Sequence, residues 1–313
     1  MAGKNGITAD GERKVFKDAG RGILVAGKAG MPDEFCRFAF DGWSRSAHAT
    51  GMTESLQTRP GRSSDRIDRK PVSGHSGLYL RIFSHEDSGF PSVQIAAAID
   101  YFRSIGGDFY TIYNLPGRRV GVVIADVCGK GRKAAAYVSV IQEALLQELN
   151  SGRYAGQILS NLNNRLARTM PDDRFATLFL GIYDTTAHSL EFANAGHPAG
   201  VLMHANGDNS RLSSTGPGLG MMTDMPFGTC RISVSPEELL VLYTDGYEID
   251  QPDGTADGER NRFLKLIEKN RYRPARDIVR ILQDDMQNRM KTCSRGDDRT
   301  MMILQFSGAV STV

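Results

Sequence analysis

Short connections between long apolar runs constrain the fold of this chain more than any other feature. Residues 175–183 are almost continuously apolar, and only five residues separate them from the strand-like segment 189–195. Residues 109–113 and 119–127 are separated by another five, which include a Pro-Gly turn. A parallel pair of strands needs a crossover of about a dozen residues or more. Each pair must therefore be an antiparallel hairpin.

The strongest apolar runs lack the polar alternation of a strand with one face in water, which indicates strands buried on both faces. These runs are 119–127, 175–183, 238–243 and 300–306. Antiparallel strands of this kind imply two sheets packed on each other, with helices on the outside. The expected fold class is therefore α+β, with two packed and mainly antiparallel sheets flanked by helices.

Amphipathic periodicity predicts the flanking helices. One begins after Gly131 and places apolar residues on one face, namely Ala134, Val138, Ile141, Leu145 and Leu149. A second is expected over 274–290, and shorter helices are expected over 154–168 and 260–270.

Composition excludes several classes of function. The 313 residues carry a net charge of only +2, so the chain is not a strongly basic nucleic-acid binder. No apolar run approaches the length of about 18 residues that a membrane span needs. The four cysteines form no C-x-x-C pair, which argues against a disulfide framework or a thiolate zinc site. We therefore expect a cytoplasmic protein without nucleic-acid or membrane partners.

The N-terminal quarter differs in texture from the rest. Residues 1–70 contain 13 Lys or Arg against 9 Asp or Glu, and their apolar residues occur singly or in short clumps. We interpret residues 1–75 as a largely disordered basic segment with a short helix near 35–40, and residues 76–313 as the folded domain. The segment is either a flexible tail or a docking arm for a partner.

The hairpin around residue 117 brings two carboxylates towards each other. If its centre lies there, Asp108 falls opposite Asp126 to within a residue. Directly opposed side chains on an antiparallel pair share a face with Cβ atoms roughly 5 Å apart, and like charges at that separation destabilise a sheet unless something neutralises them. A register shift of one residue would instead send the carboxylates to opposite faces. Spacing alone leaves the two arrangements equally open.

Further carboxylates stand at the ends of other predicted strands. Asp245 follows the run 238–243, and the pair Asp297 and Asp298 precedes the run 300–306. Each alone is compatible with turn or capping duty, but together with the hairpin pair they can gather into one acidic cluster. The donors are oxygens only, so Mg²⁺ or Mn²⁺ is implied rather than zinc. Two such ions could activate water and clamp a phosphoryl group.

Five short motifs, four of which contain these aspartates, occur in order along the chain. They are Gly-Gly-Asp in 105–110, Ala-Asp-Val-Cys-Gly in 125–131, Asn-Ala-Gly-His-Pro in 194–198, Thr-Asp-Gly in 243–246 and Asp-Asp-Arg-Thr in 297–300. Their order and spacing are similar to the metal-dependent protein phosphatase 2C (PPM) superfamily, and specifically to its bacterial SpoIIE/RsbU-type branch. The resemblance spans about 93–306, essentially all of the predicted folded domain.

The resemblance implies an αββα sandwich with a binuclear Mn²⁺ or Mg²⁺ site between the sheets. It implies hydrolysis of phosphoserine or phosphothreonine in a protein by a metal-bound hydroxide. The implied metal ligands are Asp108, Asp126, the main-chain carbonyl of Val127, Asp245 and Asp297, with Asp126 bridging the two ions, and the secondary members of the site are Asp298, Gly107 and Gly246. The expected substrate is a phosphorylated bacterial signalling protein such as an anti-sigma-factor antagonist.

Departures from the pattern of the branch leave two alternatives open. Tyr101 and Phe102 replace a Pro-Ala pair, Thr111 replaces an aspartate, and Ile249 stands where glutamate is usual, with Glu248 one residue earlier. One alternative is a PPM-fold protein that binds a partner with weak or no turnover. The other is a phosphatase for small-molecule phosphate esters.

Two further features are assigned to chance or to structure. The match of 293–300 to a cysteine-phosphatase loop contains two aspartates that would repel phosphate, so we treat it as coincidental. His197 could donate a proton, but a structural role in the Gly-His-Pro turn is favoured.

Overall fold

The chain divides into two compact units, Met1–Arg62 and Ser63–Val313. The computed structural model describes residues 6–10, 13–18, 23–28, 78–83, 92–100, 106–129, 132–171, 174–247, 256–290 and 297–308.

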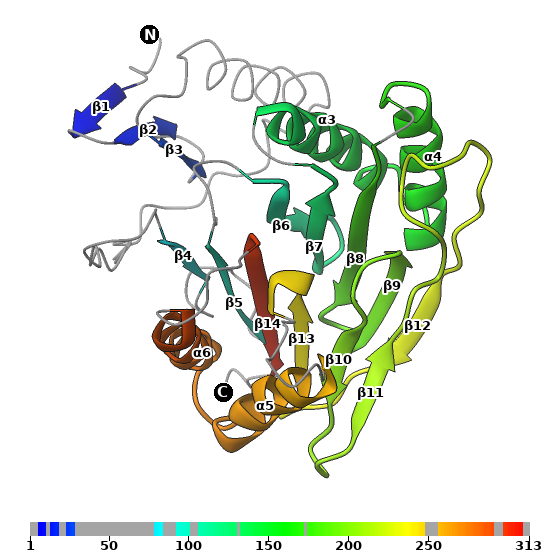
Figure 1. Cartoon of the computed structure of the whole chain (residues 1–313). Coiled ribbons are helices and arrows are strands. Elements are labelled where there is room, and N and C mark those ends of the chain that lie inside the picture. The colour runs from blue at the N-terminus through cyan, green and yellow to red at the C-terminus, as the bar shows by residue number, and fades with distance from the viewer. Residues whose placement is uncertain are drawn as a thin grey trace, which may run out of the picture. The chain divides into compact units, whose positions relative to one another are not determined.

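The first unit contains a small antiparallel sheet (Figure 1). Strands β1 (Gly6–Asp10), β2 (Arg13–Asp18) and β3 (Ile23–Lys28) pair in the order β1-β2-β3. The disorder predicted for residues 1–75 does not extend to these strands. Composition averaged over a long segment overlooks them because a hairpin depends on a tight local connection, here two residues between β1 and β2. The helix predicted near 35–40 lies outside the described residues, and the domain boundary near residue 75 stays a prediction.

The second unit is built on two antiparallel sheets. The larger has the strand order β11-β10-β13-β14-β5-β4. Its strands are β4 (Leu78–Phe83), β5 (Val93–Asp100), β10 (Gly200–Met203), β11 (Asn209–Leu212), β13 (Leu239–Tyr243) and β14 (Arg299–Phe306). The smaller has the order β12-β9-β8-β7-β6. Its strands are β6 (Asp108–Leu115), β7 (Arg119–Val127), β8 (Ala176–Asp184), β9 (Ser189–Ala195) and β12 (Cys230–Ser233).

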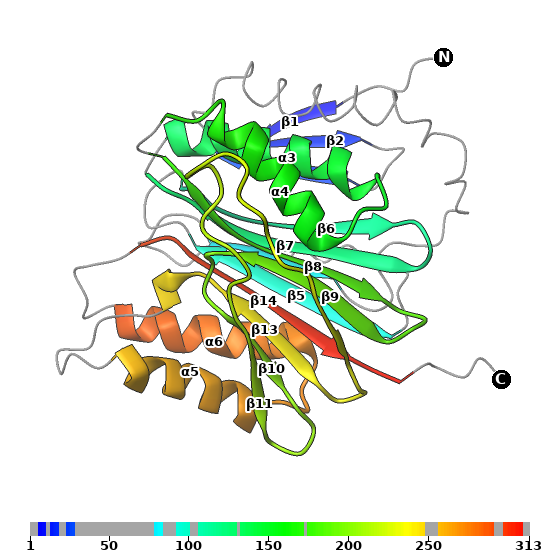
Figure 2. The ribbon, with the colours of Figure 1, turned by 90° about the vertical axis from the view of Figure 1, so that its right-hand side faces the viewer.

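Helices cover both outer faces, so the unit has four layers (Figure 2). Helices α3 (Arg132–Leu149) and α4 (Ala155–Ala167) pack on the five-stranded sheet. Helices α5 (Ala256–Lys269) and α6 (Ala275–Met290) pack on the six-stranded sheet. A third apolar cluster fills the space between the sheets. This arrangement confirms the predicted αββα sandwich, and each of the four helices predicted within residues 76–313 has its counterpart in it.

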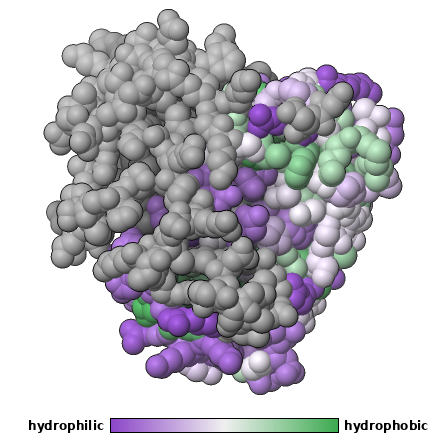
Figure 3. Space-filling model, viewed as in Figure 1, coloured by the Kyte–Doolittle hydropathy of each residue, from purple (hydrophilic) through white to green (hydrophobic). Residues whose placement is uncertain are grey.

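Apolar side chains lie mainly inside these layers. Among the described residues, the exposed large ones are Val140, Tyr154, Met221, Met222 and Tyr272. Where described residues are visible in Figure 3, the surface is largely hydrophilic with scattered apolar areas. Among the helices of the described residues, none is both long and apolar enough to cross a membrane.

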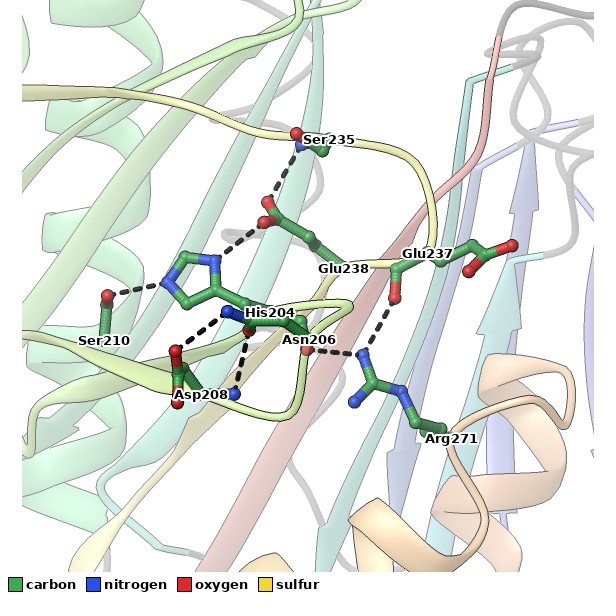
Figure 4. A network of polar contacts seen from close by, with 8 residues as sticks. All are labelled: His204, Asn206, Asp208, Ser210, Ser235, Glu237, Glu238 and Arg271. Carbon is green, nitrogen blue, oxygen red and sulfur yellow. Dashed lines mark hydrogen bonds and ion pairs between the residues drawn. The ribbon is translucent and has the colours of Figure 1, made fainter.

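A polar network joins the helix layer to one end of the six-stranded sheet (Figure 4). The buried carboxylate of Glu238 lies 2.7 Å from Nδ1 of His204, in the turn after β10. Arg271 follows α5, and its side chain is only 4% exposed. It donates to the carbonyl oxygens of His204 (2.9 Å) and Glu237 (3.2 Å) and to the carboxylate of Glu268 (2.8 Å). One guanidinium therefore links α5 to the segments beside β10 and β13.

Arg271→Ala should lower the free energy of unfolding by about 2 to 3 kcal/mol, because it deprives three acceptors of a charged donor. Urea denaturation measures the change. Arg273→Ala removes the same charge from an exposed side chain two residues away, and we expect an effect below about 0.5 kcal/mol. Equal effects from the two variants would show that the network does not stabilise the fold.

Candidate active site

The β6–β7 hairpin places Asp108 directly opposite Asp126. Both carboxylates stand at the same end of the hairpin and share one face of the sheet. Side chains alternate between the two faces along a strand, so Val122 and Ile124 of β7 lie on the same face as Asp126. Both belong to the apolar cluster between the sheets. The register that brings the carboxylates together is therefore the one that the chain adopts, and the slipped register is excluded.

Two threonine hydroxyls from the opposite sheet hold Asp108. Thr244, just after β13, and Thr300, on β14, each donate to Oδ2 of Asp108 at 2.8 Å. The threonines also bond to each other, since the amide of Thr300 donates to the hydroxyl of Thr244 at 2.9 Å. Asp108 is only 3% exposed, and both threonines are completely buried. A carboxylate of the five-stranded sheet is thus fixed by the six-stranded sheet.

Two glycines are required by close approaches of the main chain. A Cβ at Gly107 would overlap the main-chain carbonyl oxygen of Val127. A Cβ at Gly246 would overlap the carbonyl oxygen of Asp298, against which the turn that begins at Asp245 is packed. Both glycines were predicted as secondary members of the site, and the contacts give the physical reason for them.

Two hollows in the surface meet at Asp126. The larger, about 350 Å³, we name the His197 hollow; its lining is Asp126, Thr177, Gly196, His197, Pro198, Ala199, Arg211 and Asp245. The smaller, about 210 Å³, we name the Cys128 hollow; its lining is Asp126, Cys128, Gly129, Phe175, Asp297 and Asp298. The predicted carboxylates are therefore distributed around Asp126. Within the described residues, no three carboxylate, imidazole or thiol groups already converge on one point as metal ligands do.

Burial and mutual repulsion raise the pKa of both central carboxyl groups. For Asp108, burial is the largest cause and Asp126 the second, and together they outweigh the threonine hydrogen bonds, so the pKa lies well above its usual range. For Asp126, burial comes first, followed by repulsion from Asp245, Asp297 and Asp298, and its pKa rises to about 6. In their ionised forms these groups repel one another unless a cation is present.

Thr177 of β8 lies beside Asp126 on the same face of the sheet, because the two residues pair across the β7–β8 ladder. Its hydroxyl lies 2.8 Å from Nδ1 of His197, whose amide donates to the side-chain oxygen of Asn194 at 2.8 Å. The ring of His197 is buried, and burial lowers its pKa to about 3. His197 is therefore neutral near pH 7 and braces its turn, in agreement with the structural role predicted for it.

Sequence reasoning gave no role to several residues around the site. Thr244 directly precedes Asp245, and Thr300 lies three residues after Asp297 in the same motif. This repeated occurrence of threonine in the aspartate motifs is the signal that could have revealed them. Arg174 donates to the carbonyl oxygen of Cys128 at 2.9 Å and supports the loop after β7. Arg211 comes from the edge strand β11, so only the fold brings it to the His197 hollow.

The departures from the pattern of the branch are only partly visible in the structure. Thr111, which replaces the usual aspartate, accepts a hydrogen bond from Gln142 of α3 at 3.2 Å. The substitution therefore contributes a contact between β6 and the helix layer. Tyr101, Phe102, Glu248 and Ile249 lie outside the described residues.

The family profile for Stage II sporulation protein E (SpoIIE) matches residues 116–307. The chain belongs to the SpoIIE family. It is 28% identical over 206 residues to the phosphoserine phosphatase RsbU of Bacillus subtilis, and the matched region covers 65% of this chain and 60% of RsbU. It is 26% identical over 242 residues to the protein IcfG of Synechocystis, and the matched region covers 67% of this chain and 37% of IcfG. The chain thus spans less than two thirds of the length of these relatives.

Solved structures of other proteins have the same fold as this SpoIIE-family chain. The RsbU and RsbW domains of Rv1364c from Mycobacterium tuberculosis match with a TM-score of 0.59 and 25% identity, over 69% of this chain and 62% of that one. The PP2C phosphatase domain of SpoIIE from Bacillus subtilis matches with a TM-score of 0.59 and 21% identity, over 69% of this chain and 64% of that one. The αββα sandwich is therefore of the PP2C type.

The raised pKa of Asp126 predicts how stability depends on pH when divalent cations are removed. Because its pKa is about 6 in the folded chain and lower in the unfolded chain, its protonation favours folding. This contribution is complete below about pH 4 and is lost as the pH rises through about 6. In chelator, Asp126→Asn should therefore gain stability over the wild type on going from pH 5 to pH 7.5, by about 1.4 kcal/mol, because this window covers about one pH unit below the folded pKa.

Urea denaturation at the two pH values measures this difference. Asp224→Asn is the matched control, because Asp224 is exposed and its positive φ of 59° suits asparagine equally well. A difference between wild type and Asp126→Asn that stays constant with pH would contradict the assignment.

Proposed function

We propose that this SpoIIE-family chain is a metal-dependent phosphoprotein phosphatase that acts on phosphoserine or phosphothreonine in a bacterial signalling protein. The observation that carries the proposal is the pair of opposed carboxylates, the buried Asp108 and the half-buried Asp126, of which Asp126 stands at the junction of two hollows lined by further carboxylates. A site with this many like charges at close quarters is unfavourable by itself and suits bound cations.

The donor set fits two divalent cations. Carboxylate and carbonyl oxygens are the ligands that Mg²⁺ and Mn²⁺ prefer. The one imidazole of the described lining, His197, is buried, and its Nδ1 lies 2.8 Å from the hydroxyl of Thr177. We assign as ligands Asp108, Asp126, the main-chain carbonyl of Val127, Asp245 and Asp297, with Asp298 as a neighbouring carboxylate. Cations bound there would supply an activated water nucleophile and polarise the phosphoryl group.

The residues of the chain have separate tasks in this proposal. Asp108 is held in one orientation by two hydroxyls, so its ligating oxygen is positioned before a cation arrives. Asp126 belongs to both hollows, which suits the bridging position assigned to it. Gly107 leaves room for the carbonyl of Val127, which a Cβ at this position would overlap.

The class of substrate is supported by the relatives. RsbU and a second relative, RsbP of Bacillus subtilis, which is 24% identical over 217 residues, are both phosphoserine phosphatases. We infer that a phosphorylated anti-sigma-factor antagonist or a similar regulator is the substrate and that the reaction takes place in the cytoplasm. No second function is favoured by a specific observation in the described residues.

Asp126→Asn should abolish Mn²⁺-dependent release of phosphate from a phosphoserine protein, because it removes half of the opposed pair and the carboxylate common to both hollows. Phosphate release by the full chain, with and without chelator, measures the effect. Asp224→Asn again serves as the control and should retain wild-type activity. Full activity of Asp126→Asn, or of the wild type in excess chelator, would sink the mechanism.

Thr300→Val should weaken Mn²⁺ binding by about 10- to 100-fold, as expected when a group that orients a metal ligand is lost. The change removes one hydroxyl donor from Asp108, whereas Thr300→Ser keeps the hydroxyl and should bind nearly normally. Titration calorimetry with Mn²⁺ compares the two variants. Equal affinities for Thr300→Val and Thr300→Ser would mean that the hydroxyl does not prepare Asp108 for a cation.

A further inference from the structure

The two hollows that meet at Asp126 differ in charge. Of the described residues that line the Cys128 hollow, three are carboxylates and none is a cation. The His197 hollow is lined by two carboxylates, Asp126 and Asp245, and by Arg211. Among the charged side chains of the described lining, an anion meets only repulsion in the Cys128 hollow but finds a compensating charge in the His197 hollow. The His197 hollow, at about 350 Å³, also falls within the range of about 300 to 1,000 Å³ typical of ligand sites, and the other does not.

Arg211 reaches the His197 hollow from the outermost strand of its sheet. Strand β11 pairs with β10 on one side only, with Arg211 opposite Val201. The next residue, Leu212, is 3% exposed and anchors the strand in the cluster between the sheets. Within the described part of the chain, the side chain of Arg211 makes neither a hydrogen bond nor an ion pair. Its guanidinium is therefore available to a ligand.

Other cationic groups near the site are already engaged. The guanidinium of Arg299 is buried and forms an ion pair with Asp100 at 2.6 Å. Arg174 donates to the carbonyl oxygen of Cys128. His197 lines the hollow, but its buried ring is neutral near pH 7. Among the described residues that line either hollow, this leaves Arg211 as the single cation.

We propose that Arg211 binds the phosphoryl group of the substrate, and that the His197 hollow is the side from which the phosphorylated side chain enters. The inference rests on the proposed phosphatase function. A guanidinium presents its donors in a planar fork that matches two oxygens of a phosphate group. It also offsets the repulsion between a phosphate dianion and the carboxylates that remain exposed beside it. Arg211 thus supplies from the protein an anion contact that does not depend on a metal ligand.

Binding of inorganic phosphate to the Mn²⁺-loaded full chain tests this contact without turnover. Titration calorimetry should show the Kd of phosphate rising about 10- to 100-fold in Arg211→Ala, the loss expected for a charge-assisted hydrogen bond. Arg211→Lys keeps the charge without the fork and should fall between Arg211→Ala and the wild type. Mn²⁺ affinity should be unchanged in both variants.

A matched control and a kinetic readout separate this inference from simpler effects. Arg168→Ala removes the same charge from an exposed residue at the end of α4, outside both hollows, and should leave phosphate binding unchanged. With a phosphoserine peptide, Arg211→Ala should raise KM by a similar factor and affect kcat less, because the contact is made before the reaction as well as during it.

The outcomes distinguish the inference from the function on which it rests. Unchanged phosphate affinity in Arg211→Ala, in a chain that still hydrolyses the phosphopeptide, overturns the inference and leaves the function intact. A higher KM with unchanged phosphate affinity also overturns it, since Arg211 would then contact the peptide. If Arg211→Ala binds phosphate more weakly than the wild type but the wild type shows no turnover, the contact is supported and the proposed function is overturned. No phosphate binding by the Mn²⁺-loaded wild type overturns the contact outright.

Discussion

Two carboxylates held face to face across one hairpin place the strongest demand on the rest of this structure. Asp108 and Asp126 cannot separate without a shift in the β6–β7 register, which would also move the apolar face of β7 out of the core. The chain relieves their repulsion partly by hydrogen bonds and partly by the raised pKa of both groups. Packing therefore fixes the pair in an arrangement that its charges oppose.

The hydroxyls that stabilise Asp108 belong to the other sheet, so the site and the sandwich form together. Thr244 and Thr300 reach the carboxylate only when β13 and β14 are seated across from β6. Apolar packing between the sheets supplies that seating, since the cluster between them includes residues of β7, β13 and β14. A substitution in this cluster that changes the spacing of the sheets should therefore disturb the carboxylate even without touching it.

Much of this architecture was predictable because its signals are local in the sequence. Short connections identified the hairpins, and counting outward from residue 117 gave the opposition of Asp108 and Asp126 to within a residue. The sequence could not show that the two carboxylates share a face of the sheet. A register shift of one residue would send them to opposite faces, and only the packing of the folded chain excludes that shift. Arg211 could not be predicted, since its strand has four residues and its role depends on partners far along the chain. The strands within 6–28 were not predicted, because each depends on a few neighbouring residues and the composition of a long segment does not reveal them.

The proposed cation binding would be linked to folding in this chain. Near neutral pH, the metal-free chain has to keep Asp126 ionised against its neighbours or protonated above its ordinary pKa, and either choice costs stability. In the proposed function, a cation bound to the ionised carboxylates of the folded state would remove that cost and so would stabilise the fold. The distribution of the carboxylates around two separate hollows is what their mutual repulsion favours. A rigid αββα frame is needed for this purpose, because a softer frame would relieve the repulsion by slipping its register and would lose the site.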